Sequence, residues 1–215
     1  MEDSKIIELF FARNEDAIRQ TDSTYGRRLF HLADSIVRND QDAEESVSDT
    51  YMKAWVTIPP HKPQYFFAYI ARICRHFALD KLDWNNAAKR KAEIVSLTQE
   101  MELCVPDPQR EREMSGKELG MVLDSFLRTL TPENRVVFMR RYWYADSIGE
   151  IAARYGIGES AVQMRLNRTR AKLCTCLKKG SHQLMNGKDI LLGLKYVGDD
   201  LIENAELFTD IEKRW

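Results

Sequence analysis

The chain has 215 residues, of which 44% are hydrophobic and 30% are charged, and its 32 basic and 33 acidic side chains leave a formal net charge of −1. This length accommodates one large or two small domains, and the composition suits a helical protein with packed cores. No apolar run approaches the roughly 18 residues that cross a bilayer, and no signal peptide precedes the polar start, which predicts a cytoplasmic protein. A disulfide framework is not indicated by the four cysteines, which are Cys74, Cys104, Cys174 and Cys176.

Helical periodicity dominates the first part of the chain, and no segment has a convincing strand pattern. Apolar residues recur at helical spacing over 25–37 and predict a helix there. Asp40 or Asp42 is expected to cap the next helix, which continues through Trp55. A proline-rich loop follows, because prolines remove hydrogen-bond donors and restrict the residues before them. Helix is expected to resume over 64–83.

The helix that continues through Trp55 carries an acidic stripe. Asp42, Glu45 and Asp49 share one helical face through spacings of three and four residues. A solvated face is the plainest interpretation of this stripe. An enzyme that acts on nucleic acid with a metal held by Asp42, Glu44, Glu45 and Asp49 is an alternative, which the absence of a histidine from this face disfavours.

The helix predicted after the prolines mixes aromatic and basic side chains. Rings stack on unpaired bases and basic groups hold phosphates, so the mixture is typical of a surface that binds single-stranded nucleic acid. The proline-rich loop before it suits a rigid pocket wall for an unstacked base. Several of the rings must belong to the core, so only a subset can touch DNA. The side chains concerned are Tyr65, Phe66, Phe67, Tyr69, Phe77, Arg72, Arg75, His76 and Lys81.

The periodicity fades over 86–115, which predicts a linker of about 30 residues that is partly helical and mobile. A second helical block begins near Gly116. Within it, Thr131 is expected to cap a helix whose first position is Pro132, and this helix continues through Tyr142. The block is expected to close at about residue 180.

The segment 146–173 has the pattern of a helix-turn-helix. A short amphipathic helix is followed by a turn in which Gly156 suits the left-handed conformation that ends a helix. The second helix buries Val162 and Leu166 and leaves a polar, basic side outward, which is typical of a helix that enters a major groove. An ordinary helical hairpin with solvated arginines is the alternative interpretation.

The combination of these segments resembles the extracytoplasmic-function (ECF) sigma factors, the small two-domain promoter-specificity subunits of bacterial RNA polymerase. In the first half the resemblance rests on YGRRLFHLADSIVRNDQDAEESVSDTYMKAW and on FFAYIARICRHFALDKL. In the second half it rests on LTPENRVVFMRRYW and on EIAARYGIGESAVQMRLNRTRAKL. It covers residues 25–91 and 116–179, and the order and spacing of the segments make it specific.

The resemblance implies roles for three groups of residues. The acidic helix would dock on the clamp coiled coil of the largest polymerase subunit, through Asp42, Glu44, Glu45, Asp49, Tyr51 and Trp55. The proline-rich loop and the aromatic helix would melt and read the minus-ten promoter element, through His61, Lys62, Tyr65, Phe66, Arg72, Arg75, His76 and Lys81. The second helix of the helix-turn-helix would read the minus-thirty-five element, through Ser160, Ala161, Gln163, Met164, Arg165 and Arg168.

The segment after the helix-turn-helix reverses the local charge. Residues 158–180 carry a net charge of +5, whereas residues 182–215 carry −3, so the tail is expected to contact or modulate the DNA-binding surface. The tail has apolar residues at helical spacing and a break at Gly198. It resembles the short cytoplasmic segment that opens some membrane-anchored anti-sigma-type proteins in Firmicutes. We therefore expect either an anti-sigma factor or intramolecular inhibition by this tail, and a small helical cap or a disordered tail is the alternative.

These patterns predict an all-α protein in four parts. We expect a sigma region 2-like domain over 1–85, a flexible linker over 86–115, a region 4-like helix-turn-helix domain over 116–180 and a C-terminal extension over 181–215. The expected function is promoter recognition, and the expected partners are core RNA polymerase and promoter DNA. We expect no catalytic activity, no cofactor, no metal and no membrane insertion. A stand-alone helix-turn-helix regulator is the alternative, and it would bind duplex DNA tightly without a polymerase-docking helix.

Overall fold

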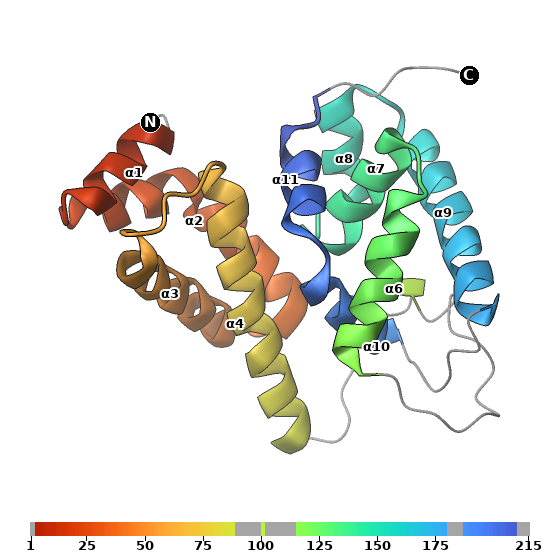
Figure 1. Ribbon diagram of the computed structural model, residues 1–215, viewed down its shortest axis with the longest axis horizontal. Helices are drawn as coiled ribbons and strands as arrows, with labels where there is room; N and C mark the ends of the chain where they lie inside the picture. Colours follow the sequence, from red (N-terminus) through yellow and green to blue (C-terminus); the bar gives the residue numbers. More distant parts are fainter. Residues whose placement is uncertain (1–2, 89–99, 102–114, 180–186, 210–215) are drawn as a thin grey trace. The chain divides into compact units, whose positions relative to one another are not determined.

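The computed structural model of the protein describes residues 3–88, 100–101, 115–179 and 187–209. Every regular element in these ranges is a helix, which confirms the predicted all-α fold (Figure 1). The chain divides into two compact units, Met1–Ala92 and Glu93–Trp215. None of the helices in the described ranges combines the length and the apolar character needed to cross a membrane.

The first unit consists of α1 (Asp3–Phe11), α2 (Asp16–Val37), α3 (Asp40–Thr57) and α4 (Phe66–Ala88). The three long helices α2, α3 and α4 each pack against the other two, and α1 packs against α2 and α4 (Figure 1). Phe10 of α1 is fully buried, and its ring centroid lies 5.8 Å from that of Phe66. The apolar faces of all four helices therefore share one core.

Three helix boundaries in this unit differ from the sequence-based expectation. The helix expected over 25–37 begins nine residues earlier, at Asp16, because its first turns bury only small side chains such as Ala17 and Thr21. The cap of α3 is Asn39, whose side-chain oxygen accepts a hydrogen bond from the Asp42 amide at 2.9 Å. The aromatic helix runs over Phe66–Ala88, so it starts two residues later and ends five residues later than expected.

The second unit begins with α6 (Gly116–Arg128), α7 (Pro132–Tyr142), α8 (Ile148–Tyr155) and α9 (Glu159–Lys179). Capping boxes start two of these helices, with Ser115 and Glu118 at α6 and with Ser147 and Glu150 at α8. In each box the serine hydroxyl accepts from the amide three residues later, and the glutamate satisfies the serine amide. Helix α7 starts with a proline and ends at Tyr142, as predicted.

The C-terminal tail folds onto the second unit. It consists of α10 (Gly187–Gly193), the 3-10 turn η1 (Leu194–Tyr196) and α11 (Asp199–Leu207), drawn in blue in Figure 1. Helix α10 and η1 pack against α6, and α11 packs against α7. The structure therefore groups the tail with the second unit, whereas the sequence-based boundaries treated 181–215 as a separate extension.

Most of the expected linker, 86–115, lies outside the described residues. Its first three residues, 86–88, continue α4. Glu100 and Met101 are described as well, and Met101 is fully buried. These two residues belong to the second unit, so the expected linker includes a point that is packed against a domain.

Candidate functional site

The turn between α8 and α9 sets the direction of the exposed helix. Gly156 ends α8 with a φ of 60°, a left-handed conformation in which a side chain would be strained. On α8, Ile151, Ala152 and Tyr155 are buried, and α8 packs against α9. This geometry confirms the predicted helix-turn-helix and presents the first half of α9 to solvent.

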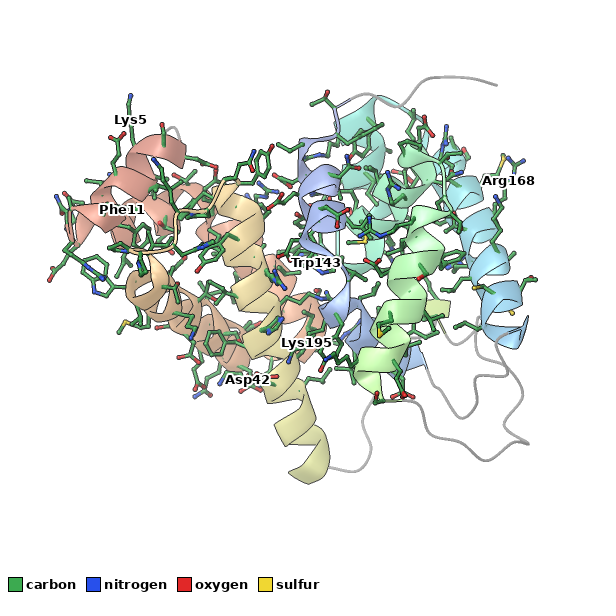
Figure 2. All side chains as sticks on the ribbon, in the orientation of Figure 1. Lys5, Phe11, Asp42, Trp143, Arg168 and Lys195 are labelled. Carbon is green, nitrogen blue, oxygen red and sulfur yellow. The ribbon has the colours of Figure 1, made fainter. Side chains whose placement is uncertain are left out.

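Helix α9 has one buried side and one exposed side. Val162 and Leu166 are buried, at 0% and 2% exposure. The exposed face that results contains Ser160, Gln163, Met164, Asn167 and Arg168. Arg168 projects from α9 away from the rest of this unit, as Figure 2 shows, and no ion-pair partner of Arg168 is found among the described residues. A polar and basic helix face of this kind matches what a major groove accepts.

Two arginines of α9 do not belong to this exposed face. Arg165 is half-buried and donates a hydrogen bond to Asn134 Oδ1 of α7 at 3.2 Å. Arg170 is also half-buried, and its Nη1 donates to Glu100 at 2.9 Å. The predicted minus-thirty-five group therefore divides into an exposed subset and Arg165, which ties α9 to α7. Ala161, also in that group, is half-buried.

Glu100 lies at the centre of a cluster of donors from α7 and α9. Its carboxylate accepts hydrogen bonds from Arg141 at 2.6 Å, from the Tyr142 hydroxyl at 2.7 Å and from Arg170 at 2.9 Å. Burial raises the pKa of Glu100, but the hydrogen bonds from Arg141 and Tyr142 and the nearby arginine charges outweigh burial and hold this pKa below its usual value. The carboxylate is therefore ionised at neutral pH. The periodicity of the sequence gave no sign of this cluster.

In the first unit, α3 presents a face that is acidic at one end and apolar at the other. Glu44 and Glu45 are exposed, whereas Asp42 and Asp49 are half-buried. The same stripe continues at intervals of three and four residues to Met52 and Val56, which are 58% and 64% exposed. Met52 and Val56 are one helical turn apart, so they form a small exposed apolar patch beside the acidic end of this face.

Sequence reasoning missed Met52 and Val56, although their spacing from Asp49 places them on its face. The remaining two members of the predicted docking group are partly structural. The Tyr51 hydroxyl donates to Asp22 of α2 at 2.8 Å, and Trp55 is half-buried with its ring centroid 6.1 Å from that of Phe10.

Some members of the predicted minus-ten group are buried in the first unit, and others reach its surface. Phe66 is 0% and Arg75 is 2% exposed, so the structure excludes both from a DNA-contacting surface. Burial lowers the pKa of the Arg75 guanidinium. Lys81 forms an ion pair with Glu45 at 2.8 Å and so joins α4 to α3. The members that reach the surface are the exposed His61 and Lys62 and the half-buried Tyr65, Arg72 and His76.

The second unit also contains an apolar groove of about 640 Å³ between α6 and the C-terminal half of α9. Met121, Val122 and Phe126 of α6 line one wall, and Lys172 and Cys176 of α9 lie on the other. In the part of the chain that the structure describes, the tail approaches α6 at Leu119 and Gly120, which do not line this groove. Among the described residues, no cluster of histidine, cysteine, aspartate and glutamate is suited to hold a metal ion.

Comparison with known proteins assigns a family to both units. Residues 23–86 match the family described as Sigma-70 region 2, and residues 120–173 match Sigma-70, region 4. The chain is 25% identical over 170 residues to the ECF RNA polymerase sigma factor SigE of Mycolicibacterium smegmatis, covering 79% of this chain and 63% of that protein. It is 23% identical over 141 residues to the probable RNA polymerase sigma factor RfaY of Xanthomonas campestris pv. campestris, covering 65% of this chain and 35% of that protein.

The chain thus spans less than two thirds of the length of either relative. Region 2 falls on the first helical unit, and region 4 falls on the unit that contains the helix-turn-helix. With both regions matched in this order, the chain belongs to the sigma-70 family, as a sigma factor of the ECF type.

Proposed function

We propose that this protein binds core RNA polymerase, recognises promoter DNA and helps to open it for transcription initiation. The observation that carries the proposal is the pairing of an exposed helix-turn-helix face on α9 with an acidic and apolar docking face on α3. Polymerase supplies the chemistry, so the protein needs no catalytic group or cofactor of its own. The same proposal places it in the cytoplasm, where polymerase and promoter DNA are found.

The two units have surfaces suited to different forms of DNA. Helix α9 suits duplex DNA, because its polar side chains reach outward from a rigid helix. The first unit suits a separated strand, because His61, Lys62, Tyr65, Arg72 and His76 combine rings with charge around the loop before α4. Binding of unpaired bases by this group would favour the open form of the minus-ten region.

The direct test is reconstitution of the full chain with purified bacterial core polymerase. We expect binding to core polymerase without DNA, and transcription from promoters that are selected from a random duplex library. Tight duplex binding by the chain alone, with no binding to core polymerase, would favour the stand-alone regulator. DNA cleavage that depends on magnesium would favour the enzyme that uses Asp42, Glu44, Glu45 and Asp49.

Arg168→Ala tests the α9 face. We expect this change to weaken binding to the selected minus-thirty-five element by about 5- to 150-fold, since a good base contact contributes about 1–3 kcal/mol. If Arg168 reads a base, the loss is confined to one base pair; if it holds a phosphate, all sequences weaken alike. Lys117→Ala, at an exposed position of α6, is the matched control and should leave binding unchanged. Equal effects of the two changes would contradict the assignment of α9.

We also propose that the C-terminal tail regulates the second unit, as an intramolecular inhibitor or as the point where an anti-sigma factor acts. The docked position of the tail favours the intramolecular form. Arg128 of α6 pairs with Asp200 of α11 at 2.7 Å, and the Gly198 amide donates to Asp124 at 2.8 Å. The tail contacts α6 and α7, and Arg154 of α8 donates to the Glu206 carbonyl. Inhibition would therefore act through α6, α7 and α8, because the tail leaves the outward side chains of α9 exposed.

Gly193→Ala tests this regulation, because α10 and α6 approach closely at two glycines. A Cβ on Gly193 would lie 2.8 Å from Leu119 Cγ, and a Cβ on Gly120 would lie 2.4 Å from Tyr196 Cβ. We expect Gly193→Ala to loosen the tail, seen as faster hydrogen exchange in α10, and to strengthen binding to core polymerase. Ser125→Ala, on the exposed side of α6, is the control. A loosened tail with unchanged polymerase and promoter binding would exclude inhibition.

A further inference from the structure

Glu100 is connected to Asn167 of the DNA-reading helix through one intervening side chain, that of Arg170. The Nη1 of Arg170 donates to Glu100 and lies 3.3 Å from the Tyr142 hydroxyl. The Nη2 of the same guanidinium donates to Asn167 Oδ1. Because a guanidinium is planar and its donors have a fixed geometry, holding one nitrogen against Glu100 also fixes the direction of the other.

Asn167 lies on the exposed face of α9. It is four residues after Gln163, three after Met164 and next to Arg168, so its side chain shares the outward side of the helix with theirs. Arg170 is a donor only, so the amide oxygen of Asn167 faces Arg170 and the NH2 group is directed elsewhere. The outward-facing group of Asn167 is therefore a hydrogen-bond donor.

We propose that Glu100 is a positioning residue for promoter reading, and that it acts through Arg170 to present the NH2 group of Asn167 to a base edge. The proposal rests on the proposed function, since it assumes that α9 enters a major groove. A donor in that groove selects a base with an acceptor, such as N7 or O6 of guanine or O4 of thymine, over the N4 amino group of cytosine. Specificity then depends on a residue that lies 67 positions before Asn167 in the sequence and outside the helix that reads DNA.

The surroundings of Glu100 support a positioning role beyond simple anchoring of the chain. Met101 is fully buried and anchors this segment by apolar packing. Glu100 faces two arginines and a tyrosine, and one of these arginines continues to the DNA-facing side. The polar contacts thus belong to Glu100 and the apolar packing belongs to Met101. Mutating each residue separately can therefore distinguish positioning from anchoring.

The experiment measures binding of the full chain to its selected minus-thirty-five duplex and to single base-pair substitutions of that duplex. Asn167→Ala should reduce discrimination at one base pair by about tenfold. Glu100→Ala should reduce discrimination at the same base pair severalfold, and the double variant should behave like Asn167→Ala alone. Additive losses, or a Glu100→Ala effect that is uniform over all duplexes, would overturn the proposal.

Two further variants separate positioning from stability. Met101→Ala should lower the thermal stability of the second unit while discrimination at that base pair stays as in the wild type. Glu100→Gln keeps the size of the side chain and removes its charge, so it should weaken discrimination while the unit remains folded. Retained discrimination in folded Glu100→Gln and a loss in Met101→Ala would assign the effect to anchoring. Failure of the proposed function is a separate outcome, because the wild-type chain would then not bind core polymerase, whereas the positioning role of Glu100 is judged only from discrimination among the duplexes.

Discussion

A chain that ends at Lys179 should have a second unit that is less stable than that of the full chain by several kcal/mol, on the order of 3–5. Arg140 of α7 is 3% exposed, and its charge is held between Asp146 and Glu206 of α11. Burial lowers the pKa of Arg140, but the two carboxylates outweigh burial and hold this pKa above its usual value. Removing the tail takes away Glu206 and leaves a buried cation with only part of its compensation.

The apolar contacts of the tail add to this loss. Ile190, Leu194, Leu201 and Ile202 are almost completely buried, and each is removed with the tail. Their removal exposes the surfaces of α6 and α7 on which they pack. The measurement is urea unfolding of both chains with hydrogen exchange of α7 as the readout. Unchanged protection of α7 in the shortened chain would contradict the prediction.

This result bears on how tail inhibition is measured. Truncation removes the tail and also destabilises the second unit. A change in polymerase binding by the shortened chain would therefore reflect both causes and would not measure inhibition alone. Glu206→Gln is the useful intermediate, because it keeps the tail and removes one carboxylate charge from Arg140. We expect it to lower stability by a smaller amount than truncation does.

Reversing the α3 face should abolish productive binding to core polymerase. In the variant Asp49→Lys with Met52→Lys, an acidic and an apolar side chain on one face are both replaced by cations. Placing like or unpaired charges in a docking surface costs several kcal/mol, so the affinity should fall by roughly 100-fold or more. Duplex binding by α9 should not change, because α9 belongs to the other unit.

The matched control changes charge by a similar amount elsewhere in the first unit. Glu8 and Glu15 are both exposed, one on α1 and the other just before α2. Glu8→Lys with Glu15→Lys should retain polymerase binding. Equal losses in the two double variants would indicate a general effect of charge and would contradict a docking role for α3. Affinity for labelled core polymerase, with circular dichroism to verify folding, is the measurement.

Local signals explain why the helix-turn-helix could be predicted from the sequence. Gly156 ends α8 in the predicted left-handed conformation, and the serine and glutamate of its capping box are three residues apart. The proline at the start of α7 is a signal of the same kind. Each of these features acts within one turn of helix, so it can be recognised without knowledge of the tertiary fold.

The features that were missed depend on residues far apart in the chain. Phe66 and Arg75 belong to a helix rich in rings and cations, and only the packing of α4 against three other helices determines which of them are buried. The same is true of Glu100, whose partners are about 40 and 70 positions away. Docking of the tail depends on Gly120 and Gly193, because a side chain at either position would clash with the segment packed against it. The sequence alone does not show that these two glycines lie where the tail meets α6.

The attachment of Glu100 to the second unit also shortens the tether between the two units. From Ala88, the last residue of α4, to Ser115, the cap of α6, a fully extended chain would reach about 90 Å. From Ala88 to Glu100 the same chain reaches at most about 40 Å, which corresponds to about 12 base pairs of B-DNA at 3.4 Å each. Each base pair inserted between the two promoter elements uses about one twelfth of this reach, against about one twenty-sixth of the reach from Ala88 to Ser115. An intact attachment should therefore make the protein less tolerant of changes in promoter spacing, and release of Glu100 and Met101 should widen the range of spacings that it accepts.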